Sequence, residues 1–138
     1  MKSRSAISVA GSVSVIDCEA PFDTITRPNT TIISPNHPEF YGWDRQCQVT
    51  LSFTGEVSIR FEDFSVCEYN SDCTDDWLEV RDGNSSNSPM IGDKLCWFDI
   101  PDPIKSTGNS ITVVFKSKKY AYLEQGFRII ADLGKYSW

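Results

Sequence analysis

The sequence predicts an all-β protein, an antiparallel β-sandwich or jelly roll, and three observations support this fold class. Hydrophobic and polar residues alternate with a period of two over most of the chain, which is typical of half-buried strands. Stretches that contain proline or glycine, namely residues 34–42, 82–89 and 99–109, separate the alternating segments. The chain has 138 residues, of which 40% are hydrophobic, so it is long enough to form one domain with a packed core.

Five segments are expected to form strands that each bury one face. Successive side chains of a strand point to opposite faces, so alternate residues share an environment. On this basis Ser58, Arg60, Glu79 and Arg81 are expected to point toward solvent. The expected strands and their buried residues are 47–53 (Cys47, Val49, Leu51, Phe53), 57–61 (Val57, Ile59, Phe61), 77–83 (Leu78, Val80), 111–115 (Ile111, Val113, Phe115) and 127–132 (Phe127, Ile129, Ala131).

Composition excludes several classes of partner and indicates an oxidising compartment. The net charge is −6 and no long basic run is present, which argues against a nucleic acid partner. The five cysteines have no zinc-ligand spacing and His37 is the only histidine, so paired cysteines outside the cytosol are the better interpretation. Asn29 and Asn84 begin glycosylation sequons, which is consistent with an extracellular, secreted chain.

The chain is expected to contain one domain with short flanking segments. Residues 1–17 are interpreted as a linker or an artificially added lead, with a trimmed or poor signal peptide as the alternative, because serines interrupt the apolar part. No stretch approaches the roughly 20 apolar residues of a membrane span, so no direct membrane insertion is expected. The domain is placed at 18–132 and a C-terminal tail at 133–138.

Five segments, in order, resemble the CUB domain, an extracellular β-sandwich module of complement proteases, bone morphogenetic proteases and spermadhesins. They are SPNHPEFYGWDRQC (34–47), IRFEDFSV (59–66), CTDDWLEVRDG (73–83), PDPIKSTGNSITVVFKS (101–117) and GFRI (126–129). The resemblance implies the disulfides Cys18–Cys47 and Cys73–Cys96. It also implies a core that contains Phe61, Phe64, Leu78, Val80, Phe115 and Phe127.

Many CUB domains hold a calcium ion at one end of the sandwich, and the resemblance places three main ligands at fixed positions. Those positions hold Cys67, Asp76 and Lys118 in this chain, so only one carboxylate remains. Calcium needs six to eight oxygen ligands, so no calcium cofactor is expected. If the loop shifts by one residue, Glu68, Asp72 and Asp75 could supply oxygens together with Asp76. Otherwise these acids are interpreted as a solvated loop, and the hypothesis for Lys118 is that it takes the place of the cation and pairs with Asp76.

Cys67 is left without a partner in the family's pattern. The open alternatives are a disulfide to another chain, which would give a linked dimer, a disulfide to a missing part of this protein, and a free or buried thiol. A Cys67–Cys73 bridge is a further alternative that would leave Cys96 unpaired.

No catalytic residues are expected, because the chain has no nucleophile, metal or phosphate-binding motif, and His37 is interpreted as a surface side chain in a turn. Binding is therefore the leading hypothesis. Two loops are the candidate contact surfaces, because tyrosine and tryptophan supply large contact area and lysine attracts acidic partners. Their alternative role is to cap the sandwich or to keep an edge soluble. The candidate residues are Lys118, Lys119, Tyr120 and Tyr122 in one loop and Tyr41 and Trp43 in the other.

Three functions remain open at this point. The first is a non-catalytic extracellular module that binds a protein partner and belongs to a larger receptor, clustering or matrix protein. The second is a standalone secreted protein of the spermadhesin kind that binds carbohydrate or sulfated glycan. The third is a targeting domain of a secreted protease. Steep salt sensitivity of binding through 116–119 would favour the second over the first.

Overall fold

The computed structural model describes residues 7–8, 14–18, 24–42, 44–66, 73–117 and 125–134. Within these ranges no helix is long and apolar enough to cross a membrane. The secondary structure of the same ranges consists of the strands β1 (Ile7–Ser8), β2 (Ser14–Asp17), β3 (Thr30–Ile33), β4 (Gln46–Ser52), β5 (Val57–Ser65), β6 (Trp77–Arg81), β7 (Ile104–Lys105), β8 (Ser110–Lys116) and β9 (Gly126–Leu133).

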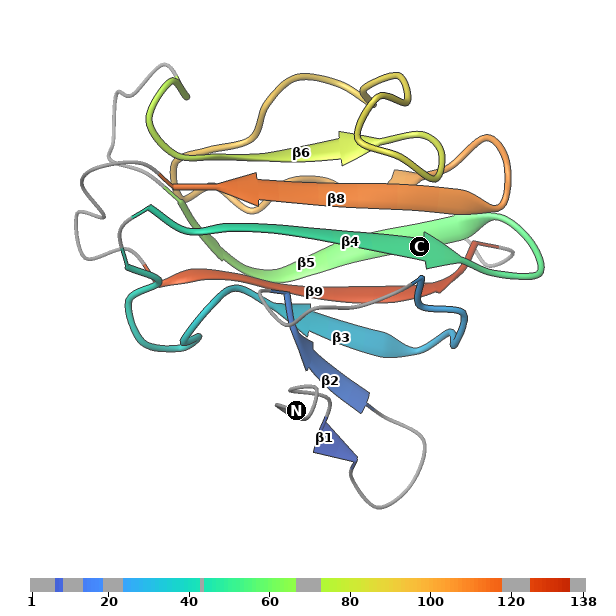
Figure 1. Ribbon diagram of the computed structural model, residues 1–138, viewed down its shortest axis with the longest axis horizontal. Coiled ribbons are helices and arrows are strands. Elements are labelled where there is room, and N and C mark those ends of the chain that lie inside the picture. The colour runs from blue at the N-terminus through green and yellow to red at the C-terminus, as the bar shows by residue number, and fades with distance from the viewer. Residues whose placement is uncertain are drawn as a thin grey trace.

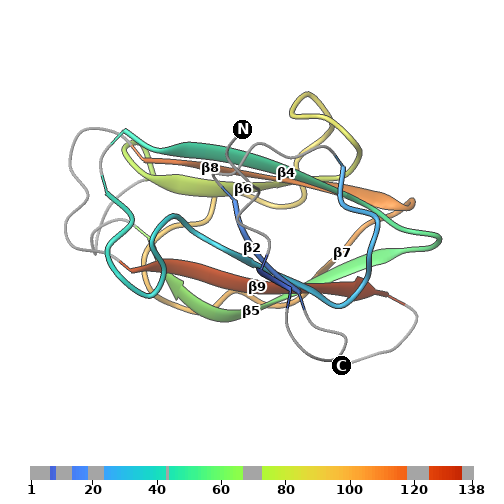
Figure 2. The same cartoon turned by 60° about the horizontal axis from the view of Figure 1, so that its bottom comes forward.

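The strands form two sheets that pack face to face, as the sequence predicts. One sheet has the order β1-β2-β3-β9-β5-β7 and the other has the order β4-β8-β6. Figure 1 shows the strands of both sheets, and Figure 2, turned by 60°, shows β4, β8 and β6 in one layer and β2, β9 and β5 in the other. The all-β sandwich is therefore confirmed.

One strand pair differs from the expected antiparallel pattern. β2 runs parallel to β3, with Ser14 opposite Thr30 and Asp17 opposite Ile33. Residues 14–17, which lie within the expected lead, are thus part of the larger sheet. The remaining pairings within both sheets, such as β4 with β8 and β5 with β9, are antiparallel.

Alternating apolar side chains from both sheets form the core. All six residues that the resemblance assigns to the core are buried. Phe61 and Phe64 contact each other edge-on, with 5.8 Å between their ring centroids. Phe115 of β8 and Phe127 of β9 contact each other at 5.3 Å between ring centroids, which joins the two sheets. Burial of such side chains contributes about 1.5–3 kcal/mol each and is the main source of stability.

Two residues that were expected to face solvent are buried instead. Ser58 has no exposed surface, and its hydroxyl has no hydrogen-bond partner among the described residues. Glu79 is only 8% exposed. The prediction of a solvated outer face is therefore wrong at these positions, and at Glu79 the reason is that the side chains of Trp77 and Arg81 contact its carboxylate.

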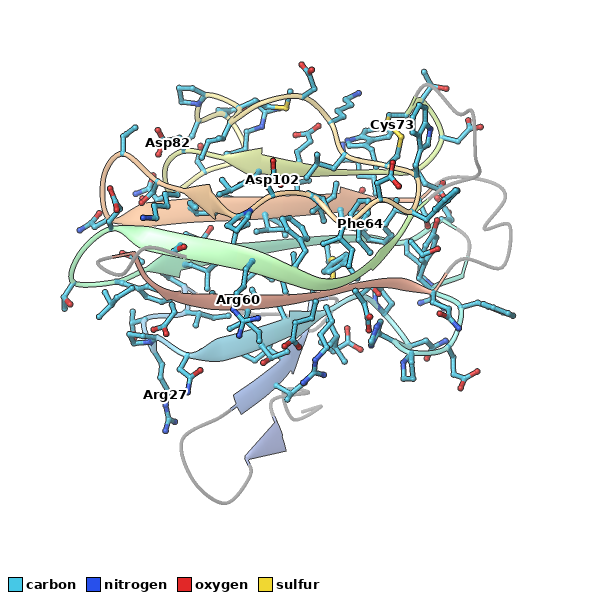
Figure 3. The ribbon with its side chains drawn as sticks, turned by 180° about the vertical axis from the view of Figure 1, so that it is seen from behind. Arg27, Arg60, Phe64, Cys73, Asp82 and Asp102 are labelled. Atoms are coloured by element: carbon cyan, nitrogen blue, oxygen red, sulfur yellow. A yellow bond between two sulfur atoms is a disulfide. The ribbon has the colours of Figure 1, made fainter. Side chains whose placement is uncertain are left out.

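Both disulfides lie at the same end of the sandwich. We call this the loop end, and we call the opposite end the turn end. At the loop end β3, β5 and β8 finish and β4, β6 and β9 begin. Cys18 follows β2 and is bonded to Cys47 of β4, so this bridge joins the two sheets. Cys73, just before β6, is bonded to Cys96. Figure 3 shows Cys73 and Asp82 at opposite ends of β6, which marks the loop end and the turn end. The predicted pairing is confirmed.

Candidate functional site at the loop end

Tyr41 and Asp76 form a buried contact between two loops of the loop end. The Tyr41 hydroxyl donates a hydrogen bond to Oδ2 of Asp76 at 2.5 Å, and neither residue has exposed surface. The Tyr41 ring also packs edge-on against Phe115, with 5.0 Å between centroids. A buried carboxylate is costly unless donors stabilise it. The hydrogen bond therefore fixes the loop before β4 against the loop before β6.

Ser117 adds a second link at the loop end. Its hydroxyl donates to the Gly42 carbonyl at 3.0 Å and accepts a hydrogen bond from the Arg45 backbone N–H at 2.9 Å. The Ser117 N–H in turn donates to the Arg45 carbonyl at 2.7 Å. The residue that follows β8 is thus held to the loop that contains Tyr41.

Ser34 and Gly126 make a third close contact. The Ser34 hydroxyl accepts a hydrogen bond from the Phe127 N–H at 2.9 Å. Gly126 has φ of +88°, and a Cβ at this position would lie 1.8 Å from Ser34 Oγ. Glycine alone combines this conformation with such a close approach. These contacts make the base of the loop end rigid.

His37 lies in this region, but it is not the surface side chain that the sequence predicts. Its side chain is 7% exposed, and its Nε2 lies 3.1 Å from Oδ2 of Asp63, which is exposed. Asp63 follows an irregularity in β5 between Phe61 and Asp63. The pair connects the loop before β4 to β5, and a single histidine beside a single carboxylate does not form a catalytic arrangement on its own.

The loop at 34–45 presents one aromatic side chain outward and keeps another inside. Phe40 is 44% exposed, whereas its neighbour Tyr41 is fully buried. For Tyr41 the structure therefore favours the capping alternative over direct contact with a partner. The other contact candidates, namely Trp43, Lys118, Lys119, Tyr120 and Tyr122, lie outside the described residues.

The acids near Asp76 do not assemble into a metal site among the residues that the structure describes. No group of three or more histidine, cysteine, aspartate or glutamate side chains gathers there. Asp75 is exposed beside the buried Asp76. Cys67 and Lys118, which stand at the other two ligand positions, lie outside the described ranges, as do Glu68 and Asp72. A thiol and an ammonium are not the hard oxygen donors that calcium requires.

Four cysteines are accounted for by the two bridges, which contradicts the alternative Cys67–Cys73 bridge because Cys73 is bonded to Cys96. The state of Cys67 itself falls outside the described ranges. Of the two sequons, Asn84 is exposed after β6, and Asn29 is half-buried with a positive φ of 59°.

Glu79 lies on the outer face of β6 in a cluster that the sequence did not reveal. Its Oε2 accepts hydrogen bonds from Arg81 Nε at 3.0 Å and Nη2 at 2.8 Å. Its Oε1 accepts one from the Trp77 indole N–H at 2.9 Å. Burial raises the pKa of Glu79, but the bonds from Arg81 and Trp77 and the charges of Arg81 and Lys94 more than offset this, so the pKa lies below its usual 4.5. The i, i+2 spacing of Trp77, Glu79 and Arg81 places the three side chains on one face of a strand, and this spacing is the sequence signal that could have revealed the cluster.

Lys94 and Lys116 complete this cluster around Trp77. The Lys94 ammonium lies 4.0 Å from the centroid of the Trp77 ring, and the Lys116 ammonium lies 5.8 Å from it. Both distances are within the range of a cation–π interaction. Trp77 is only 8% exposed, while both lysines are exposed.

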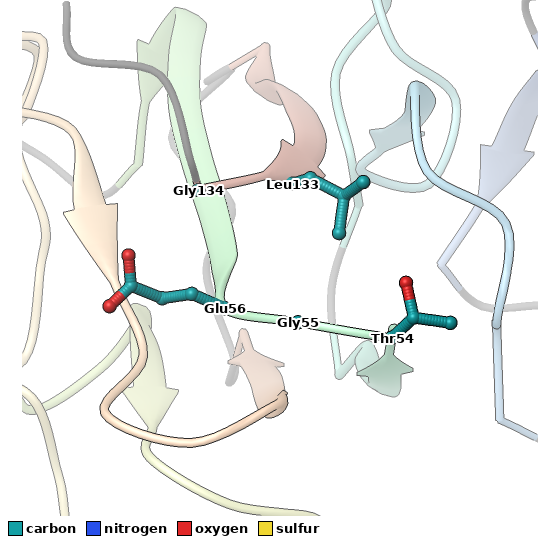
Figure 4. Close-up of a pocket in the computed structure, with 5 residues that line it drawn as sticks. All are labelled: Thr54, Gly55, Glu56, Leu133 and Gly134. Atoms are coloured by element: carbon teal, nitrogen blue, oxygen red, sulfur yellow. The ribbon is translucent and has the colours of Figure 1, made fainter.

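A pocket also lies at the turn end, between the β4–β5 turn and the end of β9. It is lined by Thr54, Gly55, Glu56, Leu133 and Gly134. Figure 4 shows Thr54 and Leu133 on one side and the Glu56 side chain extending to the other.

The fold and the loop end together define an extracellular β-sandwich module that is cross-linked by two disulfides. The sequence model of the CUB domain matches residues 18–130, and the chain therefore belongs to the CUB domain family. Members of this family are non-catalytic modules that mediate protein–protein interaction in extracellular proteins.

The relatives of the chain are much longer proteins. It is 40% identical over 95 residues to the bone morphogenetic protein 1 homolog of Strongylocentrotus purpuratus, which is 67% of this chain and 15% of that protein. It is 36% identical over 99 residues to human cubilin, which is 70% of this chain and 3% of cubilin. Among solved structures, the MASP-1 CUB2 domain bound to Ca²⁺ aligns with a TM-score of 0.69 and 24% identity, over 80% of this chain and 96% of that domain. This structural likeness shows the shared fold.

Proposed function

We propose that this chain is a non-catalytic module of a larger extracellular receptor, clustering or matrix protein, and that it binds a protein partner through the loop end. The small share of each relative that the chain covers supports a parent protein with further domains. The family's role in protein–protein interaction supports the class of partner.

The observation that carries the proposal is the buried hydrogen bond between Tyr41 and Asp76. It anchors a loop from the inside, while the adjacent Phe40 remains exposed on the outside. Residues on loops that a rigid scaffold positions are the usual contact residues of a binding module. Exposed aromatic side chains supply much of the binding energy at protein interfaces. Phe40 is therefore one contact residue that the described part of the loop end offers, and Trp97 and Phe98 are also exposed there.

A pull-down from extracellular extract tests the proposal. The intact chain is expected to capture a defined partner, and Phe40→Ala is expected to weaken the capture at least tenfold. Met90→Ala is the matched control, because Met90 is also exposed and apolar but pairs with Arg81 near the turn end. A triple change of Lys118, Lys119 and Tyr120 tests the neighbouring loop. Equal capture by Phe40→Ala, Met90→Ala and the triple variant would overturn the loop end as the binding surface.

We also infer that the calcium site of the family is degraded in this chain. The donor set supports this, since Asp76 is the one carboxylate at the three main positions and its Oδ2 already accepts the Tyr41 hydroxyl. Calorimetric titration is expected to show no calcium binding at micromolar concentration. A micromolar affinity that Asp75→Asn or Glu68→Gln weakens would instead establish the shifted site.

Cys67 offers a further test of how the module assembles. Because the other four cysteines form two bridges, a disulfide from Cys67 must lead to a second chain or to another part of the parent protein. Gel mobility with and without reductant distinguishes these arrangements from a free thiol. A band at twice the monomer mass, lost in Cys67→Ser, is the expected sign of a linked dimer.

A further inference from the structure

We propose that the outer face of the three-stranded sheet, near the loop end, binds a sulfated polysaccharide chain through Lys94 and Lys116. Trp77 acts as the positioning residue that holds the two ammonium groups over one ring. This surface is distinct from the Phe40 loop, so it adds a second ligand class to the proposed protein-binding role.

The strand register places the basic and amide side chains in one row. Gln46 of β4 lies opposite Lys116 of β8, and Lys116 lies opposite Trp77 of β6. Lys94 extends this row diagonally: its neighbour Leu95 pairs with Leu78, which places Lys94 opposite Glu79, and its ammonium reaches the Trp77 ring. Neighbouring strands are about 4.8 Å apart, so the row crosses roughly 15 Å of the sheet face.

Three cations, Arg81, Lys94 and Lys116, surround the one acid of this described cluster, Glu79. Among the described residues neither Lys94 nor Lys116 forms an ion pair, and their ammonium groups contact the Trp77 ring. The acid of the described cluster, Glu79, is bonded to both Arg81 and Trp77. Arg81 thus balances Glu79, and two positive charges remain. Although the chain as a whole carries −6, a local basic patch can still attract an anion.

The cation–π contact pre-organises the two lysines without removing their charge. An aromatic ring attracts an ammonium group but brings no formal negative charge, so the ammonium can still bind an anion. The two ammonium groups are no further apart than the sum of their distances to the same ring centroid, 4.0 and 5.8 Å. Side chains that are already ordered lose less conformational entropy when a ligand binds.

The chemistry of the row favours a sulfated sugar chain over an acidic polypeptide. Gln46 and Gln48 expose amide groups on the same face, and these can donate to and accept from sugar hydroxyls. An acidic peptide would gain more from an apolar surface beside the cations. Here, however, Trp77 is nearly covered, and Val114, which lies opposite Gln48, is buried. The ligand is thus expected to be an extended polyanion with many hydroxyls.

Binding of a heparin octasaccharide to the full chain tests the proposal. The affinity is expected to fall at least tenfold in the double variant Lys94→Gln, Lys116→Gln, with a shallower dependence on salt than the unmodified protein. Lys105→Gln is the matched control, because Lys105 is also exposed but lies on β7 of the other sheet. It is expected to bind normally. Desulfated heparin and hyaluronan are expected to bind at least tenfold more weakly than heparin.

Several outcomes would overturn the proposal. These are no heparin binding by the unmodified chain at physiological salt, equal losses in the double variant and Lys105→Gln, or equally tight binding of polyglutamate. A loss seen only in Lys118→Gln, Lys119→Gln would move the site to the neighbouring loop and would also contradict it. None of these results depends on Phe40, so they leave the proposed protein-binding function to its own test.

A second measurement does not depend on the folding of any variant. Acetylation of the unmodified protein is followed by mass spectrometry with and without heparin. Lys94 and Lys116 are expected to be protected at least fivefold by heparin, and Lys105 is expected to react equally in both samples. Unprotected Lys94 and Lys116 would contradict the proposal. Thermal unfolding distinguishes heparin binding by the two lysines from a purely structural role. In the structural case the double variant would be less stable but would bind heparin with unchanged affinity.

Discussion

Asp76 and Glu79 are three residues apart in one acidic segment, yet the fold gives them opposite environments. Asp76 precedes β6 at the loop end and has no exposed surface, and the neutral hydroxyl of Tyr41 donates to it. Glu79 lies on the outer face of β6, is 8% exposed, and accepts two hydrogen bonds from the cationic Arg81. The comparison shows that the partner of a buried carboxylate, more than the extent of its burial, decides what the site can do.

The partner of each acid also determines its surroundings. Asp76 uses its hydrogen bond to hold together two loops of the surface that we propose for binding. Glu79 is balanced by Arg81, which leaves the nearby lysines able to attract an anion. One carboxylate thus organises the loop end, and the other shapes the charge of the sheet face.

The largest expected effect is that of Asp76→Ala. The change leaves the buried Tyr41 hydroxyl without its acceptor and opens space around it, so we expect a loss of about 3 kcal/mol in the free energy of unfolding. Urea denaturation measures this. Asp75→Ala is the matched control, because Asp75 is the adjacent acid and is exposed; it is expected to change stability by less than about 0.5 kcal/mol. Equal effects of the two changes would mean that Asp76 is not buried as described.

Tyr41→Phe isolates the hydrogen bond from the packing of the ring. The ring contact with Phe115 is retained, but Asp76 loses a donor, so we expect a loss of about 2 kcal/mol. The double variant with Asp76→Ala should lose less than the sum of the two single changes, because both remove the same interaction. Additive losses in this double-mutant cycle would show that the two groups are not coupled.

Glu79→Gln is expected to be milder, at about 1 kcal/mol near neutral pH, and to depend on pH. The pKa of Glu79 is lowered in the folded protein, although burial alone would raise it, because Arg81 and Trp77 stabilise the ionised form. Its contribution is therefore fully present above the usual value of 4.5 and is lost as pH falls through the lower folded-state pKa. Unfolding measured from about pH 7 to about pH 2 should show the difference between variant and wild type shrinking below pH 4.5. A constant difference across this range would contradict the assignment.

The smallest effect is expected for Glu62→Gln on the surface of β5. Glu62 Oε1 lies 2.9 Å from Arg128 Nε and Oε2 lies 3.5 Å from Arg60 Nη1, and all three side chains are more than a third exposed. Solvent screens such pairs, so we expect a loss below about 0.5 kcal/mol that disappears at high salt. A loss as large as that of Glu79→Gln would show that the exposed ion pairs of Glu62 contribute as much to stability as the buried pair of Glu79 with Arg81.

The strands and their inward faces could be predicted because each strand repeats the same simple rule. Val49, Leu51 and Ile59 alternate with polar residues, and all three are buried as expected. The order of the cysteines and the family resemblance were sufficient to predict both disulfides.

The same rule failed where it assumed that the other face meets water. Glu79 and Ser58 are polar residues on outer faces, but both are buried. The contact between Tyr41 and Asp76 joins residues 35 positions apart, and no local pattern indicates such a pair. Likewise, the approach of Lys94 to Trp77 depends on the chain returning along the edge of β6.

The placement of both disulfides at one end has a consequence for how the domain responds to its chemical environment. Both covalent restraints, between the sheets and beside β6, act on the loop end, whereas the pairings of β4 with β8 and of β5 with β9 are held by hydrogen bonds along the whole strands. Reduction of the two bridges would therefore act first on the surface that we propose for binding, and an oxidising environment is the condition under which that surface keeps its covalent restraints.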